Sequence, residues 1–301
     1  MADLSKVWFG MVTNDSDDSG TDSPIVLIFN VQGGRFDVLH RTLPDTEQED
    51  HEQGKANLYE ITEEDFEPQA FVGATVDPQD LNASSIRIGI RGADMWRPKS
   101  VFIWGEQKDG LIVPLALNTN LQGTIGIAGQ LVGVRLSTDA GEGKLSFAPS
   151  RVQLGDANMS IRRLLLIMTT ADVDDAGTDD RIRLQITTVA GRVVVDHVLP
   201  DTSQDDLERA QANFYFAPVV SPFTRAELNA DSISLSIQGR DAWLPRRLFL
   251  FGLSAAEGEQ PSQFSVPLVH LPDWTLGTLS MDTGEGSPSV NLPVVDNIVV
   301  I

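Results

Sequence analysis

The sequence predicts an all-β protein built from two tandem antiparallel β-sandwiches. The first observation is an internal repeat, because residues 15–22 read DSDDSGTD and residues 172–179 read DVDDAGTD, with their Gly-Thr-Asp triplets 157 residues apart. The second is an alternation of polar and apolar residues, which is typical of half-buried strands. The third is that Gly, Asp, Asn and Pro fill the intervals, so the connections are expected to be turns. Short strands separated by turns indicate a sandwich.

The repeat continues in the same order along the chain and defines two domains. Its matching segments are 43–46 with 199–202, 56–59 with 212–215, 92–96 with 239–243, and 136–143 with 279–286. The spacing falls to 143 residues, so the second copy has lost loop residues, mostly opposite the acidic run 60–67. Two long units indicate complete domains rather than a solenoid. A chain of 301 residues fits two domains, and we predict them at 1–156 and 157–301.

Each predicted strand has its own pattern. The strands read in this way lie at 24–29, 86–91, 164–168, 181–186, 232–238 and 248–251. Continuous apolar runs at 164–168 and 248–251 predict buried central strands, and the others alternate or match a strand that does. The best helical stretch is 204–211, with one or two turns. The tails 106–156 and 253–301 repeat each other and are expected to add an equivalent C-terminal strand segment to each sandwich.

Composition and charge exclude several classes of function. The chain carries 22 basic and 43 acidic residues, a net charge of −21, and both halves are acidic, so nucleic acid is not expected as a partner. A chain this acidic attracts cations. The absence of cysteine excludes disulfides and thiolate chemistry. No classical signal peptide or membrane span is recognised, so the location stays open between the cytoplasm and export by a non-classical route.

Carboxylates gather in three predicted loops of each copy. Those of the first copy are Asp15, Asp17, Asp18, Asp22, Asp45, Asp50 and Asp94, and those of the second are Asp172, Asp174, Asp175, Asp179, Asp201, Asp205, Asp206 and Asp241. Calcium takes six to eight oxygen ligands on a flexible frame, which such loops supply. Zinc is disfavoured because the chain has no thiols and only four His residues. The alternative is that these Asp residues only form turns.

Three segments of the second copy resemble the PLAT family, the β-sandwiches of polycystins, lipoxygenases and the clostridial alpha toxin. Residues 176–180 (AGTDD) are similar to its Gly-Thr-Asp loop, 207–214 (LERAQANF) to its Phe-Glu-Arg-Gly segment, and 241–245 (DAWLP) to its Pro-Asp-Trp-Phe-Leu step. The resemblance covers about residues 162–252 and, less closely, 6–105. It implies a β-sandwich that docks on membranes and commonly accompanies a separate catalytic domain.

The resemblance also implies two calcium sites in each copy. In the second copy it places one at Asp175, the carbonyl of Gly177, Asp241 and the carbonyl of Ala242, and the other at Asp201, Thr202, the carbonyl of Gln204 and Asp206. By the repeat, the first copy offers Asp18, Gly20, Asp94 and Met95, then Asp45, Thr46, Gln48 and Asp50. The first copy departs from the family pattern at 51–54 and 95–98.

The aromatic and His residues suggest structural roles. Trp96 and Trp243 occupy matching positions and are expected in the core rather than as membrane anchors. Phe223 follows a proline-flanked segment and is the best candidate for an exposed tip. His40 and His197 match each other in predicted strands and are expected to be structural. No nucleophile elbow, phosphate loop or His-metal pair is present, so we do not expect an enzyme.

The sequence leaves three functions open. The first is a non-catalytic calcium-binding interaction module that mediates protein, assembly or membrane-surface contacts. The second is a purely structural subunit of a surface, secreted or multi-protein assembly without metal. The third, less favoured, is an unrecognised hydrolase. Because an anionic bilayer repels a body of charge −21, a protein partner or homo-assembly is slightly favoured over membrane lipid.

Overall fold

The computed structural model describes residues 3–31, 36–43, 51–62, 77–78, 81–82, 84–122, 133–139, 141, 143–200, 206–256, 259 and 262–296. The chain divides into two compact units, Met1–Gln153 (unit 1) and Leu154–Ile301 (unit 2). The sequence places the boundary after residue 156. The short strand β9 (Gln153–Leu154) spans the point where unit 1 ends. Among the described residues, no helix is long and apolar enough to cross a membrane.

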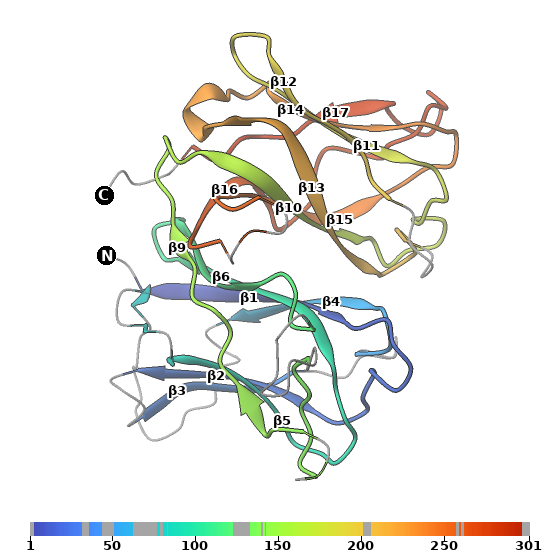
Figure 1. The fold of residues 1–301 in the computed structure, drawn as a ribbon. Coiled ribbons are helices and arrows are strands. Elements are labelled where there is room, and N and C mark those ends of the chain that lie inside the picture. Colours follow the sequence, from blue (N-terminus) through green and yellow to red (C-terminus); the bar gives the residue numbers. More distant parts are fainter. Residues whose placement is uncertain are drawn as a thin grey trace. The chain divides into compact units, whose positions relative to one another are not determined.

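Unit 1 is a sandwich of two antiparallel sheets, which Figure 1 shows as two layers. One sheet has the order β7-β6-β1-β4 and the other β3-β2-β5-β8. The bounds are β1 (Leu4–Thr13), β2 (Ile25–Val31), β3 (Phe36–Thr42), β4 (Ala56–Thr62), β5 (Ile86–Ile90), β6 (Pro98–Gln107), β7 (Ile112–Asn118) and β8 (Ser146–Phe147). Neighbouring strands in both sheets run antiparallel.

Unit 2 repeats this strand order, again in two layers (Figure 1). One sheet runs β13-β10-β15-β16 and the other β12-β11-β14-β17. The bounds are β10 (Ile161–Thr170), β11 (Ile182–Thr187), β12 (Val193–Val198), β13 (Ala212–Phe223), β14 (Ile233–Ile237), β15 (Pro245–Leu253), β16 (Phe264–Leu271) and β17 (Ser289–Asn291), with a 3-10 helix at Arg225–Glu227. The all-β sandwich fold is therefore confirmed, and the tails supply β7 and β8 or β16 and β17.

The burial of each strand follows its sequence pattern. In β14, Ile233, Leu235 and Ile237 are buried and the serines between them are half-buried, as alternation predicts. In β10, residues 164–168 are all fully buried, as a continuous apolar run predicts. The core of each unit draws on side chains from both of its sheets, such as Leu166 of β10 and Leu184 of β11.

The structure corrects two expectations. Residues 206–211 form turns instead of a helix, because Leu207 and Ala210 have φ of 66° and 60°, in the left-handed region that a right-handed helix excludes. Residues 204 and 205 lie outside the described part. Phe223 is only 1% exposed, so its prediction as an exposed tip is wrong. It ends β13, pairs with Ile161 and belongs to the core of unit 2.

Candidate calcium-binding loops

Two loops of unit 2 meet at one end of its sandwich. One is the Gly-Thr-Asp loop before β11 and the other is the Asp-Ala-Trp loop before β15. The hydroxyl of Thr178 donates to the carbonyl of Asp241 at 3.2 Å, and the N–H of Asp179 donates to Oδ2 of Asp241 at 3.1 Å. The N–H of Leu244 donates to the carbonyl of Ala176 at 3.0 Å. These bonds hold the predicted ligands Asp175, Gly177, Asp241 and Ala242 in two adjoining loops.

Unit 1 builds the same contact at matching positions. The hydroxyl of Thr21 donates to the carbonyl of Asp94 at 3.1 Å, and the N–H of Asp22 donates to Oδ2 of Asp94 at 2.9 Å. The N–H of Arg97 donates to the carbonyl of Ser19 at 3.0 Å. The predicted ligands Asp18, Gly20, Asp94 and Met95 therefore lie in adjoining loops as well. The departure from the family pattern at 95–98 does not change this arrangement.

Local sequence explains the shape of the Gly-Thr-Asp loop. Asp18 and Asp175 take φ of 55° and 58°, a left-handed conformation that Asp tolerates better than most residues. Both aspartates are exposed, whereas Thr21 and Thr178 are 2% and 3% exposed. The buried threonine anchors each loop and leaves the carboxylates outside. Sequence reasoning did not assign a role to these threonines, although they recur at the same place in both copies.

A buried tryptophan lies beneath the second loop of each unit. Trp96 and Trp243 are both fully buried, which confirms the core position and excludes these residues as membrane anchors. The indole N–H of Trp96 donates to the hydroxyl of Thr13, and that of Trp243 to the hydroxyl of Thr170, each at 3.0 Å. Each tryptophan directly follows two predicted ligands in the chain. Its bond therefore attaches the loop that carries them to β1 in unit 1 and to β10 in unit 2.

The two loops approach each other closely at a glycine in each unit. A Cβ at Gly239 would lie 1.8 Å from Oδ1 of Asp180, and a Cβ at Gly92 would lie 2.0 Å from Oγ of Ser23. Oδ2 of Asp180 accepts a bond of 2.7 Å from the N–H of Asp241. The Asp180 carboxylate therefore joins the Gly-Thr-Asp loop to the Asp-Ala-Trp loop.

A third segment, the turn 207–210, packs on the Gly-Thr-Asp loop of unit 2. The hydroxyl of Thr170 donates to the carbonyl of Leu207 at 3.0 Å, and the N–H of Ala210 to the carbonyl of Ala171 at 3.3 Å. A Cβ at Gly177 would lie 3.2 Å from the backbone N of Arg209. The glycine of the triplet thus permits the turn to sit directly against the loop.

The matching turn 51–54 of unit 1 has the same backbone despite its different sequence. His51 takes φ of 65°, and its carbonyl accepts a bond of 3.3 Å from the hydroxyl of Thr13. The N–H of Gly54 donates to the carbonyl of Asn14 at 3.1 Å. The buried His51 imidazole lies 2.9 Å, Nε2 to Oη, from Tyr59. The departure at 51–54 therefore replaces the buried Leu207 by a hydrogen-bonded His.

In unit 2 the turn 207–210 places the positively charged side chain of Arg209 beside the acidic loop that precedes β11. The Arg209 guanidinium donates from Nε to Oδ1 of Asp172 at 2.9 Å and from Nη1 to Oδ1 of Asp174. These bonds, chiefly the one to Asp172, raise the pKa of Arg209 above its ordinary value. Gln53 stands at the matching position of unit 1. Sequence reasoning cited Arg209 only within its motif and gave it no role.

The donor set fits calcium in kind, because carboxylate and carbonyl oxygens are the ligands that calcium prefers. Within the described residues, however, no group of three or more His, Asp or Glu side chains is placed to hold a metal ion. A calcium ion at Asp175 and Asp241, or at Asp18 and Asp94, would therefore depend on backbone carbonyls and water for its remaining ligands.

The second pair of predicted sites lies almost entirely outside the described residues. Asp45, Thr46, Gln48 and Asp50 fall there, as do Asp201, Thr202 and Gln204. Asp206 is described, and its Oδ1 accepts a bond of 3.1 Å from the side-chain amide of Asn213. His197 lies in β12 as expected, where burial lowers its pKa, and His40 lies in β3.

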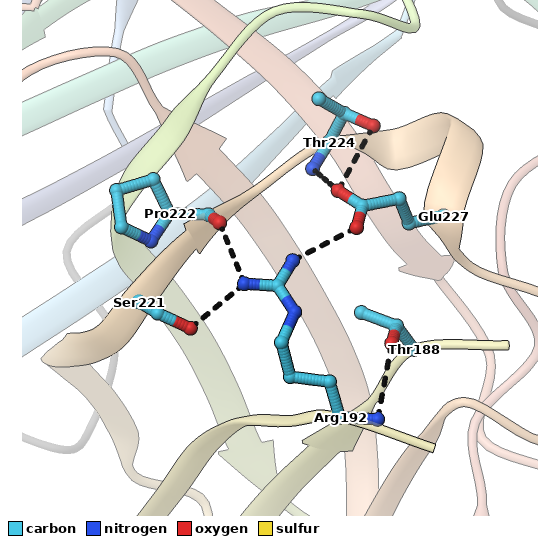
Figure 2. Close-up of polar contacts among 6 residues, drawn as sticks. All are labelled: Thr188, Arg192, Ser221, Pro222, Thr224 and Glu227. Atoms are coloured by element: carbon cyan, nitrogen blue, oxygen red, sulfur yellow. Dashed lines mark hydrogen bonds and ion pairs between the residues drawn. The ribbon is translucent and has the colours of Figure 1, made fainter. Parts of the chain in front are cut away.

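A separate polar cluster lies at the other end of β11 from the acidic loop (Figure 2). Nη1 of Arg192 donates to Oγ of Ser221 at 2.8 Å and to the carbonyl of Pro222 at 3.1 Å, while Nη2 donates to Glu227 at 2.8 Å. Glu227 also accepts the N–H of Thr224 at 2.8 Å, and these bonds lower its pKa, that from Thr224 most. The bonds of Arg192 to Ser221 and Pro222 attach the turn between β11 and β12 to the end of β13.

Comparisons with known proteins identify no family. No family model matches the chain, and no curated protein matches it. Among solved structures, the chain is similar to the alpha toxin from Clostridium absonum, with 20% identity and a TM-score of 0.30. The match covers 42% of this chain and 33% of the toxin chain. This is a weak structural likeness that leaves membership of the PLAT family a hypothesis.

Proposed function

We propose that this chain is a non-catalytic, calcium-binding interaction protein made of two PLAT-like units. The observation that carries the proposal is that both units hold the same two loops together through the same hydrogen bonds. In each unit a buried threonine donates to the carbonyl of an exposed aspartate, Asp94 or Asp241, whose carboxylate accepts a backbone N–H. A recurring loop arrangement that displays carboxylates offers oxygen ligands of the kind that a hard divalent cation takes.

The charge of the molecule supports a role for cations at this end. Asp18, Asp94, Asp175 and Asp241 are all exposed, and the chain carries a net charge of −21. Crowded surface carboxylates repel one another, and a bound cation would relieve that repulsion. Calcium would supply this neutralisation, and the loop residues would position it.

A protein partner or a further copy of the chain is the partner class that we favour over membrane lipid. The residue best suited to insert into a bilayer, Phe223, is buried. Among the described residues at the loop end of unit 2, the large exposed apolar side chains are Val173, at 50% exposure, and Met281, at 54%. Single aliphatic residues beside several carboxylates suit a mixed protein interface better than an anionic bilayer, which repels the charge of this chain.

The alternative is a structural subunit that uses the sandwich without metal, and Arg209 favours it for unit 2. Its guanidinium already pairs with Asp172 and Asp174, so part of the acidic loop is neutralised by the chain itself. A loop balanced in this way can keep its shape without calcium.

Calcium titration of the whole chain tests the proposal. Calcium should raise the melting temperature, because a ligand that binds only the folded state stabilises it by about 2.7 kcal/mol at 100 times its dissociation constant. Asp94→Asn and Asp241→Asn should each reduce this gain, since Asn keeps an oxygen acceptor for the loop N–H but removes the charge. Differential scanning calorimetry with calcium or a chelator measures the change.

Asp109→Asn is the matched control, because Asp109 also accepts a backbone N–H, from Leu111 at 3.2 Å, but lies in another turn. It should leave the calcium gain intact. If millimolar calcium does not raise the melting temperature, the calcium-binding proposal is wrong and the metal-free structural subunit is the function that remains. Calcium-dependent flotation with phosphatidylserine vesicles would show that the partner is a lipid surface and not a protein. Sedimentation with and without calcium would detect self-assembly.

A further inference from the structure

The strand β12 forms one edge of its sheet in unit 2. The described strands of that sheet run in the order β12-β11-β14-β17, so β12 has a neighbour on one side. Its sequence, VVVDHV, is rich in β-branched residues and contains neither proline nor lysine, which commonly protect an edge strand. An edge of this kind presents backbone N–H and C=O groups to another strand.

The hydrogen bonds of β11 show which residues of β12 face that edge. The N–H of Leu199 donates to the carbonyl of Ile182 at 2.8 Å, in step with the register between β11 and β12. Bonded and non-bonded pairs alternate along an antiparallel ladder, so the odd-numbered residues at the end of β12 bond to β11. In β11 the odd-numbered Thr187 donates on the other side, toward β14. Asp196 and Val198 therefore turn their backbone groups toward the edge.

The surface around these two residues is exposed and locally balanced in charge. Val198 is 38% exposed, and Asp196 is exposed as well. The Asp196 carboxylate accepts two bonds of 2.6 Å from the guanidinium of Arg183 on β11. Because this pair cancels the charge of Asp196, the edge does not carry the excess negative charge of the chain.

We propose that β12 pairs with β12 of a second copy of this chain, antiparallel and related by a two-fold axis. The inference rests on that part of the proposed function which favours a further copy as partner, and it does not require calcium. The occupant of the edge is a strand, because a strand matches its row of donors and acceptors.

The regular part of β12 allows three symmetric registers that match outward-facing residues. Asp196 opposite Asp196 sets like charges face to face, which destabilises a strand pair. Val198 opposite Val198 sets Asp196 against Pro200, which has no N–H to donate. The third register places each Asp196 opposite Val198 of the other copy, and it meets neither objection. We assign this register to the pair.

Sedimentation of the whole chain in chelator tests whether the copies associate. A contact limited to one edge is weak, so the series extends to about 1 mM protein. At about 0.15 M salt the Debye length of about 8 Å screens distant charges but not neighbouring ones. A reversible dimer is expected. A chain that stays monomeric throughout would overturn the inference and leave the edge to a strand of another protein.

Two charged substitutions at one position test the register. Val198→Asp sets a carboxylate opposite Asp196 of the second copy, twice in a symmetric dimer, and should weaken association roughly tenfold. Within its own chain the new carboxylate lies opposite Arg183, so unit 2 should stay folded. Val198→Lys sets an ammonium opposite the same Asp196 and should leave the dimer as strong or stronger. Equal weakening by both variants would contradict the register and the inference.

Val198→Pro tests the backbone contact. It removes the outward N–H without removing a bond to β11, so the dimer should be lost while circular dichroism shows a folded chain. A dimer that persists in a folded Val198→Pro variant would overturn the inference. If this variant does not fold, the two charged variants decide the matter.

Val173→Ser is the matched control. Val173 is more exposed than Val198, at 50%, but it lies in the acidic loop and not on the edge. Its replacement should leave the dimer unchanged. If Val173→Ser weakens the dimer as much as Val198→Pro does, exposed apolar surface in general drives association and the inference is wrong.

The outcomes separate this inference from the proposed function. A chain that dimerises in chelator through Val198 but shows no calcium shift would support the inference and contradict calcium binding. A chain that responds to calcium through Asp94 or Asp241 but stays monomeric would do the reverse.

Discussion

His197 shows how a single half-buried side chain connects the stability of unit 2 to pH. It lies in the edge strand β12, opposite the fully buried Leu184 of β11. Burial lowers its pKa below the ordinary 6.5, because the charged imidazolium is poorly solvated there. Between the folded pKa and 6.5 the unfolded chain therefore binds more protons than the folded chain.

The sign of this effect gives a prediction. The contribution of His197 to stability is complete above about pH 6.5 and is lost as the pH falls through that value toward the folded pKa. His197→Gln should remove this part of the pH dependence. Urea unfolding between about pH 5 and pH 8 measures it. Arg183→Gln, which leaves the imidazole in place, should keep the wild-type slope, and a wild-type slope in His197→Gln would contradict the assignment.

At the scale of elements, each loop is attached to the first strand of its unit by a tryptophan. Trp243 precedes β15, and its indole N–H donates to the hydroxyl of Thr170 at the end of β10. This bond attaches the Asp-Ala-Trp loop to β10. Both residues are buried, at 0% and 1% exposure. Removing either partner breaks this buried hydrogen bond.

Trp243→Phe should therefore destabilise unit 2 by about 1–3 kcal/mol, through the lost bond to the Thr170 hydroxyl, which keeps its own bond to the carbonyl of Leu207, and through the smaller ring. The double variant with Thr170→Val should cost less than the sum of the single variants, because the two lose one shared bond. Chemical denaturation measures all three. Trp274→Phe is the control, since its N–H bonds to the carbonyl of Gly277 in a half-buried site and its loss should cost less. Strict additivity would contradict the bond.

The strands were predictable because their signal is local, whereas the errors concern contacts between distant residues. Alternation identified β5, β11 and β14, and apolar runs identified β10 and β15. The helix expected at 204–211 fails because Leu207 is held in a left-handed conformation by its bond from Thr170, 37 residues earlier. Phe223 was placed at a tip because prolines surround it, but its strand continues to pair with Ile161.

The candidate site was predictable in part. The repeat identified the loops that carry Asp18, Asp94, Asp175 and Asp241, because the same residue types recur at the same places. The contact of Arg209 with Asp172 joins residues 37 positions apart, and nothing in the spacing of the sequence indicates it. A matched position occupied by a cation in one copy and by Gln in the other is the signal that could have revealed it.

At the scale of the whole molecule, charge opposes compactness. A net charge of −21 gives a self-repulsion that salt reduces, because the Debye length falls from about 30 Å at 0.01 M to about 3 Å at 1 M. Exposed ion pairs such as Arg183 with Asp196 are weakened by the same salt, but each contributes little. The repulsion should dominate.

Sodium chloride should therefore raise the melting temperature between about 0.01 M and 1 M. Scanning calorimetry at fixed pH measures the shift. Comparing the melting temperature in calcium and in magnesium at equal ionic strength separates binding at a specific site from screening. Screening alone should raise the melting temperature equally with both ions. A melting temperature that falls with salt would show that ion pairs such as that of Arg192 with Glu227 outweigh the repulsion.

The buried indole beneath each loop also gives the protein an optical reporter of its own. A tryptophan enclosed in apolar surroundings emits at shorter wavelength than one in water, and its emission moves when the enclosure opens. Trp243 lies between the Asp-Ala-Trp loop and β10, so a chain in which the other four tryptophans are replaced by phenylalanine would report that loop alone. The corresponding chain that retains Trp96 would report the loop of unit 1, and the two could be read without dye or label.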